Sequence, residues 1–323
     1  MRTAEKQLRL KLNNGELMPA VATGTAPMKQ FNTEFILKAI ELGYRHFDTA
    51  KFYGPSEKIL GEAFQEAFKQ GLVKREELFI TTKIPPSDMN PADIIPTLKT
   101  SLSALQVDYV DMYLIHWPLR VRAGATWWQL TPEDYLPLDM PGCWKALEEC
   151  VELGLTKGIG VSNWSVKNLK SLVSHAKIIP AVNQIERHPG CEQSAIVNYC
   201  KEIGTVVTGY AALGAPGYGA LPLGTYGTNA VIESPILQEI AAKYGKTSAQ
   251  VALRWALELG CGVVVKSVNP VRMAQNIDLF DFALTDEDLE SIKAMPHHKI
   301  EHGHWFVGPG SPYKTTDDLW AEE

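Results

Sequence analysis

The 323-residue chain has few cysteines, and their spacing indicates neither a disulfide framework nor a metal site. No two of them form a Cys-x-x-Cys pair, and their number is odd: Cys143, Cys150, Cys191, Cys200 and Cys261. Disulfides are rare in the cytosol, so this usage favours reduced thiols in an intracellular, cytosolic protein.

Long hydrophobic runs and an excess of positive charge are also lacking. No apolar run opens the chain or is long enough to span a bilayer, so we expect no membrane segment. The formal net charge is −6, whereas a nucleic-acid partner needs a basic face. A bound nucleotide cofactor needs only a local cluster of cations and stays compatible with this balance.

The sequence contains no Gly/Ser linker, low-complexity tract or charge block that divides it, so we expect one domain over residues 1–323. It also lacks a Gly-x-Gly-x-x-Gly fingerprint. Gly158-Ile159-Gly160 begins like one, but Asn163 stands where the third glycine belongs. Any dinucleotide must therefore bind without the Rossmann motif.

What the sequence does contain is a regular alternation of short apolar runs and amphipathic stretches. Residues Leu8–Met18 predict a hairpin that turns at Asn13-Asn14-Gly15. Eight strands are then predicted at Ala20–Thr23, Arg45–Asp48, Leu78–Lys83, Tyr109–His116, Gly158–Ser162, Ala181–Gln184, Val206–Tyr210 and Cys261–Val265. Helices are predicted at Thr33–Leu42 (with Thr33 as N-cap), Ser56–Lys69, Pro91–Leu105, Pro141–Leu153, Val166–Ser174, Gln193–Glu202, Ser248–Leu259, Val271–Phe280 and Asp286–Met295. Eight such units favour a closed (β/α)8 barrel of the TIM type over an open doubly wound sheet.

Polar residues stand at the C-terminal ends of these strands, which is where functional residues of such a barrel gather. They are Asp48, Lys83, His116, Ser162-Asn163, Gln184, Tyr210 and Lys266-Ser267, with Tyr53 in the loop after Asp48. Each residue alone has a structural explanation. Tyr53 could be a packed loop residue, Lys83 could extend from a strand end to solvent, and His116 could be a hydrogen-bonded core histidine. Their common placement favours a functional site.

The chemistry available to this set is acid catalysis. A free tyrosine has a pKa of about 10, and a nearby ammonium can lower it by about 1–3 units. A carboxylate beside the lysine keeps it charged, so Asp48, Lys83 and Tyr53 provide a relay that can protonate a developing alkoxide. His116 could orient the same carbonyl oxygen. Because no metal or side-chain nucleophile completes the set, the reductant must be a cofactor.

Five motifs in order resemble the aldo-keto reductases over essentially the whole chain. They are the stretch Gly43–Gly61, Leu114–Pro118, Gly160–Asn163, Asn183–Glu186 and Lys266–Asn276. The resemblance implies a (β/α)8 barrel that reduces aldehydes or ketones with NADPH, and a catalytic set of Asp48, Tyr53, Lys83 and His116.

The same resemblance implies the cofactor contacts. The nicotinamide carboxamide would meet Ser162, Asn163 and Gln184, with its ring on Tyr210. The 2′-phosphate would meet Lys266, Ser267 and Arg272, and the adenine would meet Gln275 and Asn276. A cation at a helix N-terminus suits a phosphate, and Arg272 should favour NADPH over NADH. Gln275 departs from the acidic residue that many members carry there.

The substrate pocket shows a second departure. Ala26-Pro27-Met28 replaces a tryptophan that lines the pocket in many members, which would admit bulkier carbonyl compounds. The resemblance also assigns Trp117, Trp127, Trp128 and Trp305 to the pocket. The loops Leu119–Met140 and Ala211–Ala230 and the tail Pro296–Glu323 would complete it. The tail's Gly308–Lys314 and Asp318–Trp320 resemble plant members such as chalcone and codeinone reductases.

Two alternative functions stand beside the reductase. A binding or regulatory subunit would keep the cofactor and lose turnover. A Schiff-base aldolase or isomerase is disfavoured, because a lysine paired with Asp48 stays charged and is a poor nucleophile. The histidines at 297, 298, 302 and 304 lack a closing cysteine or carboxylate pattern, so we expect a solvated or substrate-facing tail and no metal. We expect a monomer.

Overall fold

The computed structural model describes residues 8–26, 31–216, 227 and 229–321. Within them, eight parallel strands close into a barrel in the order β3-β4-β5-β6-β9-β10-β11-β12, with β12 pairing back onto β3. The strands are β3 (Val21–Gly24), β4 (His46–Asp48), β5 (Phe79–Ile84), β6 (Met112–Ile115), β9 (Ile159–Ser162), β10 (Val182–Glu186), β11 (Val206–Tyr210) and β12 (Gly262–Val265). The predicted (β/α)8 barrel is confirmed.

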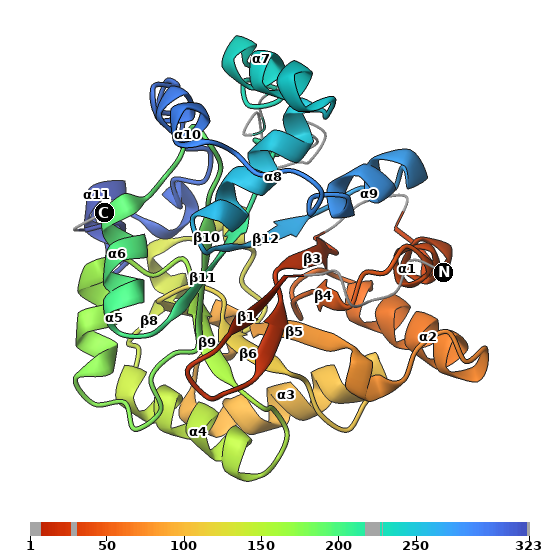
Figure 1. The fold of residues 1–323 in the computed structure, drawn as a ribbon. Helices are drawn as coiled ribbons and strands as arrows, with labels where there is room; N and C mark the ends of the chain where they lie inside the picture. Colours follow the sequence, from red (N-terminus) through yellow and green to blue (C-terminus); the bar gives the residue numbers. More distant parts are fainter. Residues whose placement is uncertain (1–7, 27–30, 217–226, 228, 322–323) are drawn as a thin grey trace.

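Helices surround the strands on the outside of the barrel (Figure 1). They are α1 (Thr33–Glu41), α2 (Ser56–Lys69), α3 (Pro91–Leu105), α4 (Met140–Glu152), α5 (Val166–Val173), α6 (Ser194–Glu202), α7 (Pro235–Tyr244), α8 (Ser248–Glu258), α9 (Pro270–Ile277), α10 (Asp286–Lys293) and α11 (Thr316–Leu319). Both faces of most strands are buried, because side chains fill the barrel on one side and helices cover the other. No helix in the described part of the chain is both long and apolar enough to cross a membrane.

One helix was not predicted, and one N-cap prediction was wrong. Helix α7 was not predicted, although Ser234-Pro235 marks its start and Gly245, with φ +62°, its end. Thr33 was predicted as the N-cap of the first helix, but Asn32 holds that position and its side chain accepts a hydrogen bond from the Phe35 amide. An asparagine caps a helix at least as well as a threonine does.

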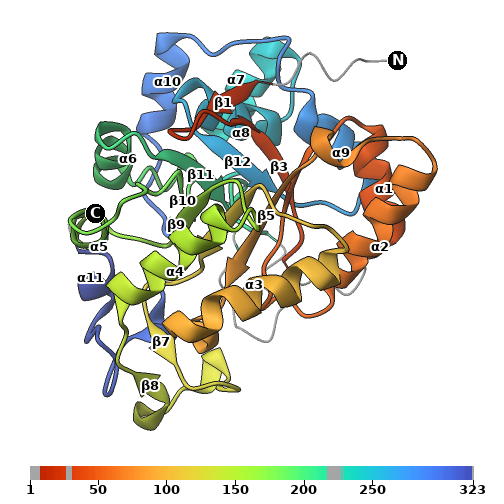
Figure 2. The ribbon, with the colours of Figure 1, turned by 90° about the horizontal axis from the view of Figure 1, so that it is seen from below.

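The predicted N-terminal hairpin is confirmed, with β1 (Arg9–Lys11) antiparallel to β2 (Leu17–Pro19). Its Leu12 and Met18 pack with Phe79 and Met112 from the starts of two barrel strands, so the hairpin covers the N-terminal end of the barrel. In Figure 2 the hairpin and the short strands β7 (Arg120–Val121) and β8 (Tyr135–Leu136) lie on opposite sides of the barrel. The long β6–α4 loop, which carries β7 and β8, therefore lies at the C-terminal end.

The segment after α10 crosses this C-terminal end, and hydrogen bonds from its backbone amides hold it there. The amides of Ile300 and Glu301 donate to the carboxylate of Glu186, at 2.8 and 2.6 Å. The amide of His298 donates to the carbonyl of Gly190 at 2.6 Å. Beyond these contacts lie the one-turn helix η7 (His304–Phe306) and α11. The last residue of β10 thus holds the tail in place.

Candidate active site

The ion pair between Lys83 and Asp48 lies at the centre of the C-terminal end of the barrel. Lys83 Nζ donates to Asp48 Oδ1 at 2.6 Å and to the Thr49 carbonyl at 2.9 Å, and both charged side chains are almost fully buried. Burial lowers the pKa of Lys83, and the Asp48 carboxylate opposes that shift. Asp48 thus stabilises a buried ammonium that the interior alone would discharge.

Tyr53 lies on the loop between β4 and α2, and hydrogen bonds hold its backbone. Its amide donates to the Ala50 carbonyl at 2.9 Å, and its carbonyl accepts from the Ser56 hydroxyl at 2.9 Å. Lys83 Nζ lies 5.3 Å from the centroid of the Tyr53 ring. The structure therefore brings the predicted acid, its lysine and its carboxylate together.

His116 completes the predicted set from the end of β6. Its ring is buried and meets the Tyr53 ring edge-on, with centroids 5.6 Å apart. Burial, with the Lys83 charge adding to it, holds the His116 pKa well below 6.5. A neutral imidazole carries one N–H donor, and among the described residues its Nδ1 has no hydrogen-bond partner.

The residues predicted for the nicotinamide form a connected network beside this set. Gln184 Nε2 donates to Asp48 Oδ2 at 2.7 Å, and the Ser162 hydroxyl donates to the Gln184 carbonyl at 2.8 Å. Asn163, with φ +63°, donates to the His116 carbonyl at 3.0 Å and accepts from the Tyr210 hydroxyl at 2.7 Å. The amides and hydroxyls that a carboxamide needs thus border the catalytic set; their role as its partners stays a prediction.

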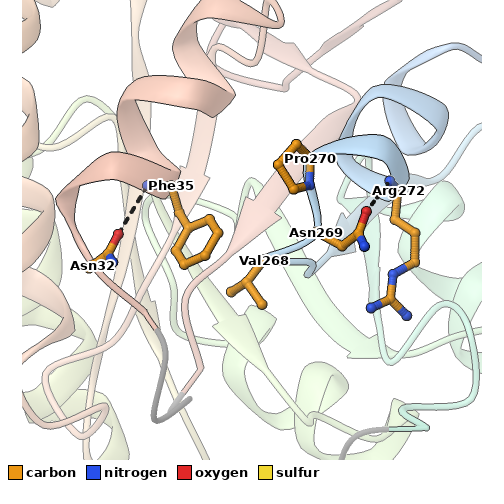
Figure 3. Close-up of a pocket in the computed structure, with 6 residues that line it drawn as sticks. All are labelled: Asn32, Phe35, Val268, Asn269, Pro270 and Arg272. Atoms are coloured by element: carbon orange, nitrogen blue, oxygen red, sulfur yellow. Dashed lines mark hydrogen bonds between the residues drawn. The ribbon is translucent and has the colours of Figure 1, made fainter.

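The residues predicted for the 2′-phosphate lie beyond β12, near a pocket of about 530 Å³ (Figure 3). Arg272 lines this pocket from the first turn of α9, together with Val268, Asn269 and Pro270. On the other side it is lined by Phe35 of α1 and by Asn32, the N-cap of that helix. The Asn269 side chain caps α9 by accepting from the Val271 and Arg272 amides, at 3.0 and 3.1 Å. Arg272 itself is exposed, as a guanidinium that receives a phosphate must be.

The remaining predicted cofactor residues flank this helix. Lys266 follows β12 directly, and burial lowers the pKa of its ammonium. The Ser267 hydroxyl accepts from the Asn269 amide at 3.1 Å. Gln275 is half-buried and Asn276 buried on α9. Their contacts with a cofactor stay predictions.

The predicted pocket residues differ in position. The Trp127 ring lies edge-on to His116, with centroids 5.3 Å apart. Trp117 is buried against Phe306, at 4.9 Å, and Trp305 accepts a hydrogen bond from Tyr135 through its backbone carbonyl. Ala26 is half-buried just after β3. The side chain of Trp128 and the residues Pro27 and Met28 lie outside the described part of the structure, as does much of the loop Ala211–Ala230.

Three further features of this end were not predicted. Phe52 stacks on Trp127, and Phe306 contacts the same indole. The one sequence signal for a role of Phe52 was its position next to Tyr53.

Glu186, His188 and Cys191 place their ligand atoms within 4.8 Å of one another. His188 Nδ1 accepts from the Gly190 amide and Nε2 pairs with Glu186 at 2.9 Å, so internal hydrogen bonds already use the two imidazole nitrogens.

Comparison with known proteins agrees with this architecture. The model of the aldo/keto reductase family matches residues 20–296. The chain is 44% identical to the 7-acetyl-epi-neemfruitin B aldo-keto reductase of Melia azedarach, with 96% of each chain covered. It is 42% identical to NADPH-dependent codeinone reductase 1-4 of Papaver somniferum, with 97% of each covered. It superposes on the Bombyx mori aldo-keto reductase in complex with NADP with a TM-score of 0.81, at 34% identity, covering 91% of this chain and 95% of the other.

A barrel with a buried carboxylate, lysine and histidine and a half-buried tyrosine at its C-terminal end defines a class of oxidoreductases. The chain belongs to the aldo/keto reductase family, and its similarity to the plant codeinone reductases bears out the resemblance drawn from the tail.

Proposed function

We propose that Tyr53 is the general acid of an NADPH-dependent carbonyl reduction catalysed by this chain. The observation that carries the proposal is the position of Lys83: its ammonium is bonded to Asp48 and lies 5.3 Å from the Tyr53 ring, which in turn lies against His116. Carbonyl reduction places negative charge on the substrate oxygen. A phenol next to a fixed cation is suited to protonate that oxygen.

Asp48 and Lys83 act on the phenol through charge and position. Burial lowers the pKa of the Lys83 ammonium, and the carboxylate 2.6 Å away opposes that shift. Gln184 and Lys83 bond different oxygens of Asp48, so the carboxylate is fixed from both sides. The cation therefore stays near the phenol and favours the phenolate that forms as the proton leaves.

His116 orients the substrate by donating a hydrogen bond. Its pKa lies well below 6.5, so the ring is neutral at physiological pH and its N–H can point to the carbonyl oxygen. A charged imidazolium there would compete with Tyr53 as the proton source. Burial beside Lys83 excludes that state.

The chain is an NADP-dependent oxidoreductase. The donor set fits the group: buried amides of Asn163 and Gln184 for a carboxamide, and an exposed guanidinium, Arg272, for a phosphate. When bound, NADPH supplies the hydride for the carbonyl carbon. Arg272 holds the 2′-phosphate through charge-assisted hydrogen bonds, and Lys266 adds a second, half-buried cation nearby.

The physiological substrate is proposed to be a bulky carbonyl compound of specialised metabolism. Two observations support this: the small Ala26 where many members carry a pocket tryptophan, and relatives whose names specify codeinone and a neemfruitin. The tail from 296 contributes to the pocket, since Phe306 lies 5.3 Å from the Trp127 ring centroid. A monomer in the cytosol remains the prediction for assembly and location.

The test is an NADPH-oxidation assay over aldehydes, ketones and alkaloid-like carbonyl compounds, run in parallel with NADH. The expected result is turnover with NADPH and much weaker turnover with NADH. Tight NADPH binding with no turnover on any compound would instead favour the cofactor-binding regulatory subunit. The complete catalytic set argues against that alternative.

A further inference from the structure

Two aromatic side chains from different loops form a parallel stack beside the catalytic set. The rings of Phe52 and Trp127 have centroids 3.7 Å apart and planes that differ by 2°. Phe52 lies on the β4–α2 loop, and Trp127 begins the short helix η4 (Trp127–Gln129) in the β6–α4 loop. At that separation the rings are in van der Waals contact, so no substrate ring fits between them.

The stack continues to the catalytic histidine. Trp127 meets His116 at 5.3 Å with planes 72° apart, and it meets Phe306 of the tail at 5.3 Å with planes 69° apart. Each of these edge-to-face geometries is a favoured arrangement for aromatic pairs. The indole is therefore held by three rings, and Phe52 supplies its one parallel contact among the ring pairs described here.

The residues on both sides of Phe52 are held by polar contacts. The Lys51 ammonium pairs with Asp88 at 2.6 Å, and the Tyr53 amide donates to Ala50 at 2.9 Å. Asp88 also accepts hydrogen bonds from Ser87 and Thr97. A Phe52 held in this way keeps the plane of the Trp127 indole parallel to its own ring.

Phe52 and Trp127 are only half-buried, so neither is closed off from solvent, and the Trp127 ring centroid lies 5.3 Å from that of His116. A flat apolar surface makes more contact with a planar ring than with a puckered one. A carbonyl group that reaches His116 brings its own substituent against that surface. The affinity for a carbonyl compound at this site should therefore depend on whether its ring is planar.

We propose that Phe52 is a specificity-determining residue: by fixing Trp127 beside His116 it gives the carbonyl site a flat aromatic wall that selects carbonyl compounds bearing a planar ring. The inference rests on the proposed reductase function and names a substrate class for it. Phe52 acts through Trp127 and is a positioning residue.

The test compares two ketones of the same carbon skeleton, 2-acetonaphthone and 2-acetyldecalin, which differ in planarity. The dissociation constant of each ketone from the enzyme–NADP⁺ complex is measured by isothermal titration calorimetry, which needs no turnover. The wild type should bind the planar ketone more tightly. Phe52→Ala should reduce that preference about five- to tenfold, whereas Phe52→Tyr, which keeps the ring, should retain it within about twofold.

Phe52→Leu and thermal melting of each variant separate lost selectivity from lost folding. Leucine keeps apolar volume without a planar ring, so a folded Phe52→Leu should also lose the preference. An unchanged preference in folded Phe52→Ala and Phe52→Leu, an equal loss in Phe52→Tyr, or no preference in the wild type would each overturn the proposal. Selective binding without turnover would overturn the reductase function and leave the role of Phe52 standing.

Discussion

Gln184 donates a 2.7 Å hydrogen bond to Asp48 and so joins the amide predicted for the cofactor to the carboxylate of the catalytic set. β10 runs two residues beyond its predicted end, to Glu186, so Gln184 sits within the strand and reaches across the barrel. Lys83 Nζ donates a hydrogen bond to the other Asp48 carboxylate oxygen at 2.6 Å. One buried carboxylate therefore links the residues predicted for catalysis with a residue predicted for the cofactor.

Lys83→Met should abolish most turnover and also destabilise the fold. It leaves Asp48 buried without its cation, for which we expect a loss of about 3–5 kcal/mol in the free energy of unfolding. Lys51→Met is the matched control. It breaks a pair of the same 2.6 Å length whose side chains are 31% and 20% exposed, and it should cost about 1 kcal/mol or less. Equal losses in denaturant unfolding of the two variants would contradict the role assigned to burial.

His116→Gln should make the fold less sensitive to acid. Burial keeps the His116 pKa well below 6.5 in the folded protein, so the unfolded chain binds the extra proton as the pH falls below about 6.5 and stability is lost there. The variant should lose about 2 kcal/mol less between pH 7 and pH 5, measured by urea unfolding. His175→Gln, at an exposed position, should follow the wild type. Parallel curves for wild type and His116→Gln would contradict the expected neutral histidine.

Arg272→Ala should weaken NADPH binding about 10- to 100-fold, since a charge-assisted hydrogen bond is worth about 1.5–3 kcal/mol. NADH lacks the 2′-phosphate, so its dissociation constant should stay within about twofold. Tryptophan fluorescence titration measures both. Lys58→Ala, which removes an exposed cation on α2, should change neither. An equal loss for the two nucleotides would place the 2′-phosphate elsewhere.

Glu301→Gln should stabilise the protein at alkaline pH. The Glu301 pKa is raised to about 7: burial is the largest cause and the Glu186 charge adds to it, while the Gly303 amide and Lys299 oppose the rise. The folded state therefore holds a proton that the unfolded state releases, and stability is lost as the pH rises from about 4.5 through 7. Glutamine can still accept from the Gly303 amide, so the variant should melt higher at pH 8 and lose that advantage at pH 4.5. The exposed control Glu290→Gln should show no such change.

The barrel could be predicted from the sequence because the hydrophobic periodicity agrees with the residues that start and end the helices and strands along most of the chain. The helix predicted from Asp286 is one example: in the structure Thr285 and Asp288 form a capping box at the start of α10, with both reciprocal hydrogen bonds present. Helix α7 was missed because its signals, Ser234-Pro235 and Gly245, follow a long loop that was assigned to the pocket. Strand β6 begins at Met112, three residues later than predicted. The Ile80 amide of the neighbouring strand donates its hydrogen bond to the Asp111 carboxylate and not to a backbone carbonyl of β6.

Much of the candidate site could be predicted residue by residue, because strand ends of a closed barrel converge. The contacts could not. That Gln184 reaches Asp48, or that Phe52 stacks on Trp127, depends on loop paths and on side-chain rotamers that no local pattern encodes. The tail's attachment to Glu186 likewise joins segments that only the closed barrel brings together.

The measurement that tests the central claim most directly is turnover and NADPH binding of Tyr53→Phe side by side. Loss of the phenolic proton should lower kcat by about 10²- to 10⁴-fold, while the dissociation constant of NADPH stays within about twofold. Tyr244→Phe, on α7 and bonded to Asp288, should leave turnover unchanged. A Tyr53→Phe enzyme that turns over at a near-normal rate would contradict the account.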